Sequence, residues 1–475
     1  MLIQHTLRYL PAQLLSPLAQ LLSMVLWTHW LAPSQMGIFT LVTVTQEIAY
    51  LVCLSWFSVY ALRYLPSSDD AAAMRRYLGT ENVVLLASVV AGFVVAAGTA
   101  VSLADASQRW TATLAIGAYF VTRAASQHYA ERARAQSAFL AYTSLQTAGP
   151  VGGLLLGLLA MQHVQADAWT LLLAYAAAQL GGVVLALPLM GMQWSLLAAD
   201  RALLAAAAAF GAPLLGLGIL GWVGENYIRY LVQWQEGAAA LGLMIVGWAL
   251  GRRCASVASM LVTTAAFPLA SRLLNAGRRD QALMQLRVNA ALMVGVLVPV
   301  TVGVEILGAA LVALTVASEY QQLTAELLGL SMFAGALRNL HMHVTDQLMV
   351  LERRFGMVAR IDVVEIVACA LASLAGLALN GIPGAVMGQA LGSALTLLLS
   401  VSWARTRLGF EWPTVETLKV LAASAIMALG LQAINVPHSL QGLLTASLAG
   451  AVLYGACLAA LFWPDLRRFV GMSRA

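Results

Sequence analysis

Apolar runs of about 20 or more residues recur along almost the whole chain and are separated by short polar connections. An α-helix rises about 1.5 Å per residue, so a run of this length crosses the hydrocarbon core of a bilayer. The pattern therefore predicts an all-α, polytopic membrane protein with about fourteen transmembrane helices. The predicted spans are 8–31, 36–65, 81–104, 110–131, 139–162, 168–192, 202–224, 238–268, 288–315, 323–350, 358–380, 383–405, 416–435 and 440–463.

Positive charge is concentrated in alternate connections between these runs. The opposite set of connections carries little beyond Arg109. The positive-inside rule places the basic set in the cytoplasm, and the two termini, which carry Arg8 and Arg467, fall on the same side. An even number of spans is therefore required. The basic set holds Arg63, Arg75, Arg76, Arg132, Arg134, Arg201, Arg272, Arg278, Arg279, Arg287, Arg353, Arg354, Arg360, Arg405, Arg407 and Lys419.

Composition supports the membrane assignment and excludes several functions. Hydrophobic residues make up 61% of the chain and charged residues 10%, which could not form a water-soluble surface. The net charge of +5 is spread over short connections, so no nucleic-acid partner is expected. The sequence contains no GxxxxGK(S/T), HExxH or GxSxG motif and no CxxC spacing, so we expect no catalytic residue, metal or cofactor. With these functions excluded, transport across the membrane is the function that we expect.

The runs fall into two similar halves of six spans each. Each half opens with two long runs joined by a short turn on the outer side, at LAPSQMGIF (31–39) and QEGAAALGLM (235–244). A pattern R-x4-H-x2-D/E also occurs in the fourth and tenth spans, which correspond in the two halves. A match of three residues can arise by chance in a chain of this length, so common ancestry and accident both stay open. The pattern comprises Arg123, His128 and Glu131, and then Arg338, His343 and Asp346.

Four arginines lie inside predicted spans: Arg123, Arg252, Arg253 and Arg338. A lipid-facing charge costs about 3 kcal/mol on insertion scales, so we expect these side chains to face an internal aqueous cavity. Guanidinium groups bind phosphate oxygens bidentately, and the excess of positive charge suits a pyrophosphate headgroup. The alternative is that each arginine closes an ion pair between helices.

Acidic residues and histidines in the spans are candidates for ion coupling or for such ion pairs. Glu305 is the strongest candidate, because it stands alone in an apolar run and is expected to be buried there. The other candidates are Glu47, Glu225, Asp346, His128 and His343.

Several short patterns follow one another in a fixed order between about residues 10 and 400. They are LAPSQMGIF (31–39), ALRYLP (61–66), FGAPLL (210–215), AALGLM (239–244), FPLASRL (267–273), ASEYQQ (317–322) and GIPGAVMGQALG (381–392). In this order they resemble the polysaccharide exporters of the multidrug/oligosaccharidyl-lipid/polysaccharide (MOP) superfamily, which includes the Wzx-type lipid-linked oligosaccharide flippases.

The resemblance implies a fold and a function. Two six-helix lobes, 1–200 and 201–410, would form a MATE-like V around a central cavity, and 411–475 would add two helices and a cytoplasmic tail. The lobes would rock in alternating access. The substrate would be a polyprenyl-pyrophosphate-linked oligosaccharide, moved across the bacterial inner membrane for exopolysaccharide or O-antigen synthesis. A polysaccharide polymerase and export proteins would be partners.

Three other functions fit a chain of this kind. A multidrug or organic-ion exporter of the same fold would need acidic residues in the cavity to bind cations. A membrane-embedded glycan polymerase or ligase normally needs a sizeable outer loop, whereas the predicted outer connections here are short. A noncatalytic scaffold in a secretion complex would show no lipid transfer after reconstitution.

Overall fold

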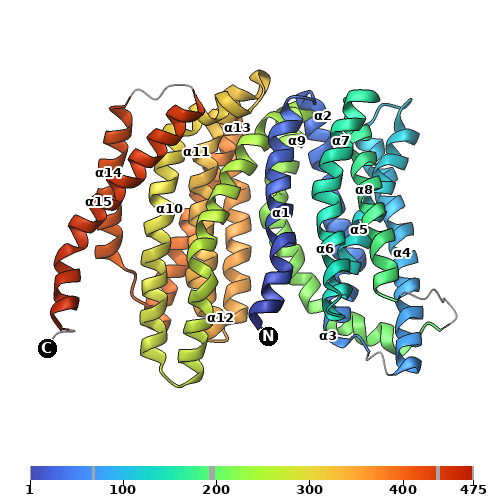
Figure 1. Ribbon diagram of the computed structural model, residues 1–475, viewed down its shortest axis with the longest axis horizontal. Helices are drawn as coiled ribbons and strands as arrows, with labels where there is room; N and C mark the ends of the chain where they lie inside the picture. The colour runs from blue at the N-terminus through green and yellow to red at the C-terminus, as the bar shows by residue number, and fades with distance from the viewer. Residues whose placement is uncertain (1, 67–69, 192–197, 435–438, 473–475) are drawn as a thin grey trace. The chain divides into compact units, whose positions relative to one another are not determined.

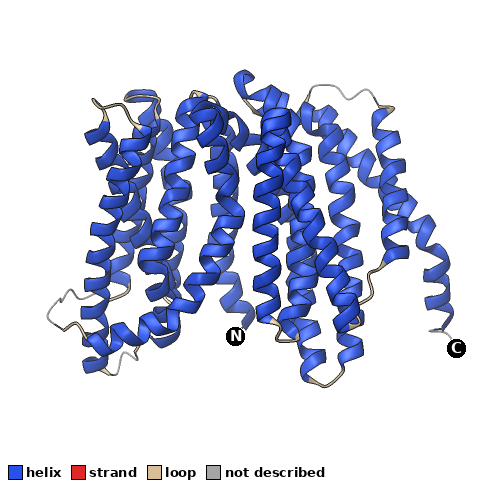
Figure 2. Ribbon diagram, turned by 180° about the vertical axis from the view of Figure 1, so that it is seen from behind, coloured by secondary structure: helices blue, strands red, loops and turns tan. Residues whose placement is uncertain are grey.

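The computed structural model describes the 475 residues except 1, 67–69, 192–197, 435–438 and 473–475. Helices account for all the regular secondary structure in the described part of the chain, and Figure 2 shows them joined by short loops. The predicted all-α polytopic class is confirmed. Nine helical segments among the described residues are long and apolar enough to cross a membrane. The chain is therefore a multi-pass membrane protein.

The chain divides into two compact units, Met1–Gly242 and Leu243–Ala475. The division falls inside α9 (Arg201–Asn275). The lobe boundaries predicted at 200 and 410 stay predictions. Besides the first part of α9, the first unit holds α1 (Leu2–Thr28), α2 (Pro33–Tyr50), η1 (Leu51–Ser55), α3 (Trp56–Tyr64), α4 (Ala71–Leu103), α5 (Arg109–Ala135), α6 (Phe139–Thr147), η2 (Ala148–Gly152), α7 (Gly153–His163) and α8 (Ala168–Leu189).

The second unit contains the rest of α9 and the elements that follow it (Figure 1). The segments named η are single turns of π-helix inside longer helices. The elements are α10 (Arg279–Thr315), α11 (Ser318–Leu340), η3 (His341–Asp346), α12 (Gln347–Leu351), α13 (Phe355–Leu408), α14 (Thr414–Gln432) and α15 (Leu440–Met472).

Two helices each contain two predicted spans. In α9 the backbone leaves helical geometry at Gly237, where φ is 82°. In α13 it does so at Asn380 and at Gly381, where φ is 60°. Positive φ favours glycine, so the turn predicted within QEGAAALGLM and the connection between the predicted spans 358–380 and 383–405 lie where the sequence placed them. The connection between the predicted spans 416–435 and 440–463 lies almost entirely outside the described residues.

The two legs of α13, 355–379 and 382–408, pack against each other at very close range. A β-carbon added at Gly384 would meet the carbonyl of Gly376, and one added at Gly388 would meet the backbone of Ala372. Small residues allow such backbone contact between helices in a membrane. The legs therefore form a tight hairpin, and their outer faces carry large apolar residues.

Rows of exposed apolar side chains mark the surface that faces lipid. On α4, Leu86, Val90 and Val94 follow one another at intervals of four residues and are 54%, 59% and 68% exposed. Residues four apart share one face of a helix. A water-soluble protein rarely exposes so large a contiguous apolar surface, so these rows agree with burial in a bilayer.

Candidate functional site

A polar cluster in the first unit is centred on Glu47, in the last turn of α2. The Glu47 side chain is exposed, although its helix is apolar. Arg123 of α5 and Arg229 of α9 lie close enough to interact with it electrostatically, and so does Glu225 of α9. The structure therefore brings together three of the predicted site residues, Glu47, Glu225 and Arg123, and adds Arg229.

Arg123 is half-buried in this cluster, and no described residue forms a hydrogen bond or an ion pair with it. Its Nη1 lies 3.7 Å from the position that a β-carbon on Gly149 of η2 would occupy. The described polar side chains around Arg123 form hydrogen bonds with one another and not with Arg123. Thr122 donates a hydrogen bond to Gln179 Oε1 at 2.9 Å. The Arg123 guanidinium therefore keeps its hydrogen-bonding capacity for a ligand or for water.

His128 belongs to a separate, fully buried group. Its Nε2 lies 2.8 Å from Glu81 Oε1, and its Nδ1 lies 2.9 Å from Ser58 Oγ. Arg132 Nη1 donates a hydrogen bond to Glu81 Oε2 at 2.6 Å. Glu81 and His128 are 0% exposed, so this group cannot be an open binding site. Of the two roles expected for His128, ion coupling or an ion pair, the structure shows the ion pair.

Arg132 corrects the sequence analysis, which assigned it to a polar connection. It lies in the last turn of α5, and only 1% of its side chain is exposed. The sequence analysis also missed Glu81, because Glu81 is the first residue of a predicted span and looked like part of the preceding polar connection.

A second buried charged cluster lies in the second unit. Arg338 Nη1 is 3.1 Å from Glu365 Oε1, and 13% of the Arg338 side chain is exposed. His341 Nε2 is 3.1 Å from Asp346 Oδ1, and His341 Nδ1 is 3.5 Å from Glu365 Oε2. Arg338 thus has an acidic partner on another helix. The sequence left open whether each arginine faces a cavity or closes an ion pair between helices, and Arg338 does the second. A charge inside an apolar run is the signal that could have found Glu365.

Part of this cluster has the spacing of a cation site. His341, Asp346 and Asp362 each offer one ligand atom, and these atoms lie within 4.8 Å of one another. One imidazole and two carboxylates suit a divalent cation such as Mn²⁺ or Zn²⁺. The ion pairs of His341 with Asp346 and Glu365 account for the position of the histidine without a metal.

The two copies of the R-x4-H-x2-D/E pattern make different contacts. In the first copy His128 is buried against Glu81 of α4. In the second copy His343 is half-buried and lies 3.4 Å from Gln347, while the neighbouring His341 is the buried histidine. A π-helical turn adds residues per turn and redirects the side chains that follow it, and η3 begins between Arg338 and His343. The contacts therefore favour a chance match.

The remaining predicted residues differ in exposure. The Arg252 guanidinium lies 5.0 Å from the centroid of the Trp248 ring, a cation–π contact, and both Arg252 and Arg253 are half-buried. The expected burial of Glu305 is wrong. Its side chain is exposed, and a carboxylate oxygen lies directly against Gly329 of α11.

An apolar groove of about 600 Å³ runs between α10, α14 and α15. Pro299 and Leu307 of α10, Leu431 of α14 and Leu444 of α15 contribute to its walls. Tyr454 of α15 donates a hydrogen bond to the Gly295 carbonyl at 2.6 Å, which ties α15 to α10. The two C-terminal helices lie beside α10 (Figure 1), and the groove is between these three helices.

A scan of protein-family models gives no match to this chain, and neither does a search of curated protein sequences. Solved structures do match. The lipid II flippase MurJ, in an inward closed conformation, has 10% sequence identity and a TM-score of 0.67, over 96% of this chain and 99% of that chain.

Two multidrug transporters match as well. An inward-facing MATE family transporter of the MOP superfamily has 13% identity and a TM-score of 0.60, over 83% of this chain and 94% of its own. The MATE multidrug transporter DinF-BH has 13% identity and a TM-score of 0.50, over 86% of this chain and 95% of its own.

These likenesses define the class of fold. The chain is a multi-pass membrane protein whose fold is that of the lipid II flippase MurJ and of MATE transporters. The resemblance to the MOP superfamily that the sequence suggested is confirmed at the level of the fold. At identities of 10% to 13%, the likeness carries the fold and leaves the substrate to be argued from the residues.

Proposed function

We propose that this protein is a flippase that moves a polyprenyl-pyrophosphate-linked oligosaccharide across the bacterial inner membrane by alternating access. The observation that carries the proposal is the apolar groove between α10, α14 and α15, because a polyprenyl chain needs an apolar surface along the protein while its headgroup crosses. The match to a protein described as a lipid II flippase, which covers 96% of the chain, agrees with a lipid-linked substrate.

Guanidinium groups inside the spans are the candidates for binding the diphosphate. Arg123 suits this role best, because no described residue forms an ion pair with it and it is half-buried. Arg252 and Arg253 are further candidates. Arg338 would have to break its ion pair with Glu365 before it could contact the substrate. We therefore assign Arg338 a structural role ahead of a binding role. In this proposal both termini are cytoplasmic, and a polymerase and export proteins receive the product.

The proposal is tested with the purified chain in proteoliposomes that contain a polyprenyl-diphosphate oligosaccharide, using a membrane-impermeant glycosidase to follow its exposure. Arg123→Ala should slow flipping about tenfold or more, since a charge-assisted hydrogen bond contributes about 1.5–3 kcal/mol. Arg109→Ala is the matched control, because Arg109 is exposed at the start of the same helix. Equal rates for the wild type and Arg123→Ala would refute the role of Arg123, and no flipping by the wild type would refute the function.

A multidrug exporter is the second candidate, and Glu47 is the observation that favours it. Glu47 is an exposed carboxylate on an apolar helix, which is the kind of group that binds an organic cation. The nearby Arg123 and Arg229 offset its charge, so we rank this function second. Uptake of a cationic dye by the same proteoliposomes, abolished in Glu47→Gln, would reverse the ranking.

A further inference from the structure

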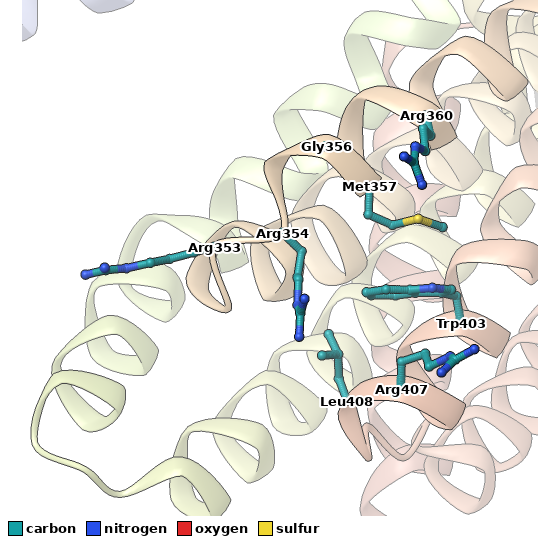
Figure 3. Close-up of a pocket in the computed structure, with 8 residues that line it drawn as sticks. All are labelled: Arg353, Arg354, Gly356, Met357, Arg360, Trp403, Arg407 and Leu408. Carbon is teal, nitrogen blue, oxygen red and sulfur yellow. The ribbon is translucent and has the colours of Figure 1, made fainter.

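A basic pocket of about 640 Å³ lies at the open end of the α13 hairpin, within the second unit. Its lining comes from the start of the first leg of α13, from the connection before it and from the end of the second leg (Figure 3). Figure 3 shows Arg354, Arg360 and Arg407 around Trp403, with Arg353 extending away from them. The pocket therefore gathers guanidinium groups around one aromatic ring.

Within the described part of the chain, no acid pairs with the three arginines around Trp403. The lining contains no acidic residue, and no described residue forms an ion pair with Arg354, Arg360 or Arg407. Of the acids that lie near them in the sequence, Glu352 is engaged by Arg279 at 2.8 Å, Glu411 by Arg287 at 3.3 Å, and Asp362 lies beside His341 and Asp346. Since like charges repel one another, an anion that enters this pocket relieves the repulsion and gains several charge-assisted hydrogen bonds.

Apolar rows run from the pocket along both legs of the hairpin. On the second leg, Leu395 and Leu399, each 47% exposed, precede Trp403 and then Arg407 at intervals of four residues. Side chains at this interval share one face of a helix, so the face changes from apolar to aromatic to cationic along its length.

The first leg carries a second row of the same kind. Phe355, at 61% exposure, lies beside the pocket, and Val363, Val367 and Leu371, at 44%, 51% and 62% exposure, continue away from it at intervals of four residues. The order of acyl-like surface, tryptophan and arginine is the order in which a bilayer presents acyl chains, interface and phosphate.

We propose that this pocket binds an anionic phospholipid. Arg354, Arg360 and Arg407 hold the phosphodiester, Trp403 packs at the level of the glycerol, and the acyl chains lie along the exposed rows of α13. Basic pockets between transmembrane helices on the cytoplasmic side are suited to anionic headgroups, and the positive-inside rule places this end of α13 on that side. The lipid is a bound ligand and is not transported, so the inference does not depend on the proposed function.

A lipid fits the pocket better than a soluble phosphate does. The polar part of a soluble ligand would use the arginines but would leave Trp403 and Met357 without a role in binding. A phospholipid uses both the charges and the apolar rows that lead away from them, and burying apolar area adds about 25 cal/mol per Å².

The test uses the purified full-length chain in detergent and counts bound lipids by native mass spectrometry. Phosphatidylglycerol and phosphatidylcholine with identical acyl chains are titrated separately. The wild type should bind one phosphatidylglycerol at least tenfold more tightly than phosphatidylcholine. The double variant Arg354→Gln/Arg407→Gln should lose that difference.

The control is Arg405→Gln, which removes one positive charge from the same turn of α13 as Arg407 but outside the pocket lining. It should keep the preference for phosphatidylglycerol. An equal loss in Arg405→Gln, or no headgroup preference in the wild type, would overturn the proposal, because the attraction would then be diffuse. All the changed arginines are exposed, so both variants should fold, and size-exclusion chromatography checks this.

Competition separates the sources of phosphate. Inorganic phosphate at millimolar concentration should leave phosphatidylglycerol bound. Displacement by inorganic phosphate would assign the pocket to a soluble anion, and displacement by an equimolar polyprenyl diphosphate would assign it to the flippase substrate. Either result would replace the phospholipid proposal.

Discussion

At the scale of single residues, the decisive property of each buried charge is whether another side chain compensates it. Arg132 and Arg338 have acidic partners, whereas Arg123 has none among the described residues. Arginine therefore serves as a structural residue at one position of α5 and in α11, and as a binding candidate at a second position of α5.

Breaking the buried pair of Glu81 should destabilise the first unit strongly. Glu81→Ala leaves the Arg132 guanidinium at 1% exposure without its carboxylate, and removing one partner of a buried pair costs about 3–5 kcal/mol. Unfolding in detergent with increasing denaturant measures the change. Glu131→Ala is the control, because Glu131 pairs with Arg134 at the surface and should change stability by less than about 1 kcal/mol. Similar losses in both variants would contradict this account.

Arg353 holds a left-handed backbone conformation, with φ of 57°. A residue with a β-carbon is strained there by about 1 kcal/mol or more, and glycine is not. Arg353→Gly should therefore stabilise the chain by up to about 1 kcal/mol, measured as a rise in Tm. Arg353→Ala removes the same charge but keeps the β-carbon, so it should leave Tm nearly unchanged. An equal rise in both variants would point to charge repulsion instead of backbone strain.

At the scale of elements, the α13 hairpin depends on the small size of its contact residues. Gly384→Ala would place a methyl group against the carbonyl of Gly376, and overpacking of this kind costs about 1–3 kcal/mol. Gly98→Ala in α4 is the control, since nothing lies within 4 Å of the added carbon, and it should stabilise that helix by about 0.5–1 kcal/mol. Thermal unfolding should move in opposite directions for the two variants, and a shift in the same direction would contradict the packing argument.

The elements also show how far sequence reasoning reaches. Each of the fourteen predicted spans overlaps a helical segment of the described residues, and nine of the helical segments there are long and apolar enough to cross a membrane. Glycines identified the turns inside α9 and α13. Neither signal reveals which residues of different helices meet, so the partner acids Glu81 and Glu365 were missed.

At the scale of the whole molecule, the proposed flippase activity makes a prediction about the length of the lipid. Ser447 lines the groove between α10, α14 and α15, so Ser447→Trp should fill part of it. Flipping of a long polyprenyl substrate should fall about tenfold or more, while a substrate with a short isoprenoid chain should be affected much less, because the buried apolar area grows with chain length. Ala449→Trp, at an exposed position of the same helix outside the groove lining, should flip both substrates normally. Equal effects on both chain lengths would show that the groove does not hold the lipid.

The sequence by itself determined that this chain is built of membrane-spanning helices whose basic residues are concentrated in alternate connections. Those properties depend on the length, hydropathy and charge of continuous segments, and each is read from neighbouring residues. Only the tertiary structure decided which charges are compensated, that Arg123 has no ion-pair partner among the described residues, and that α14 and α15 form a groove with α10. These features are distances between residues far apart in the chain, and packing of whole helices sets them.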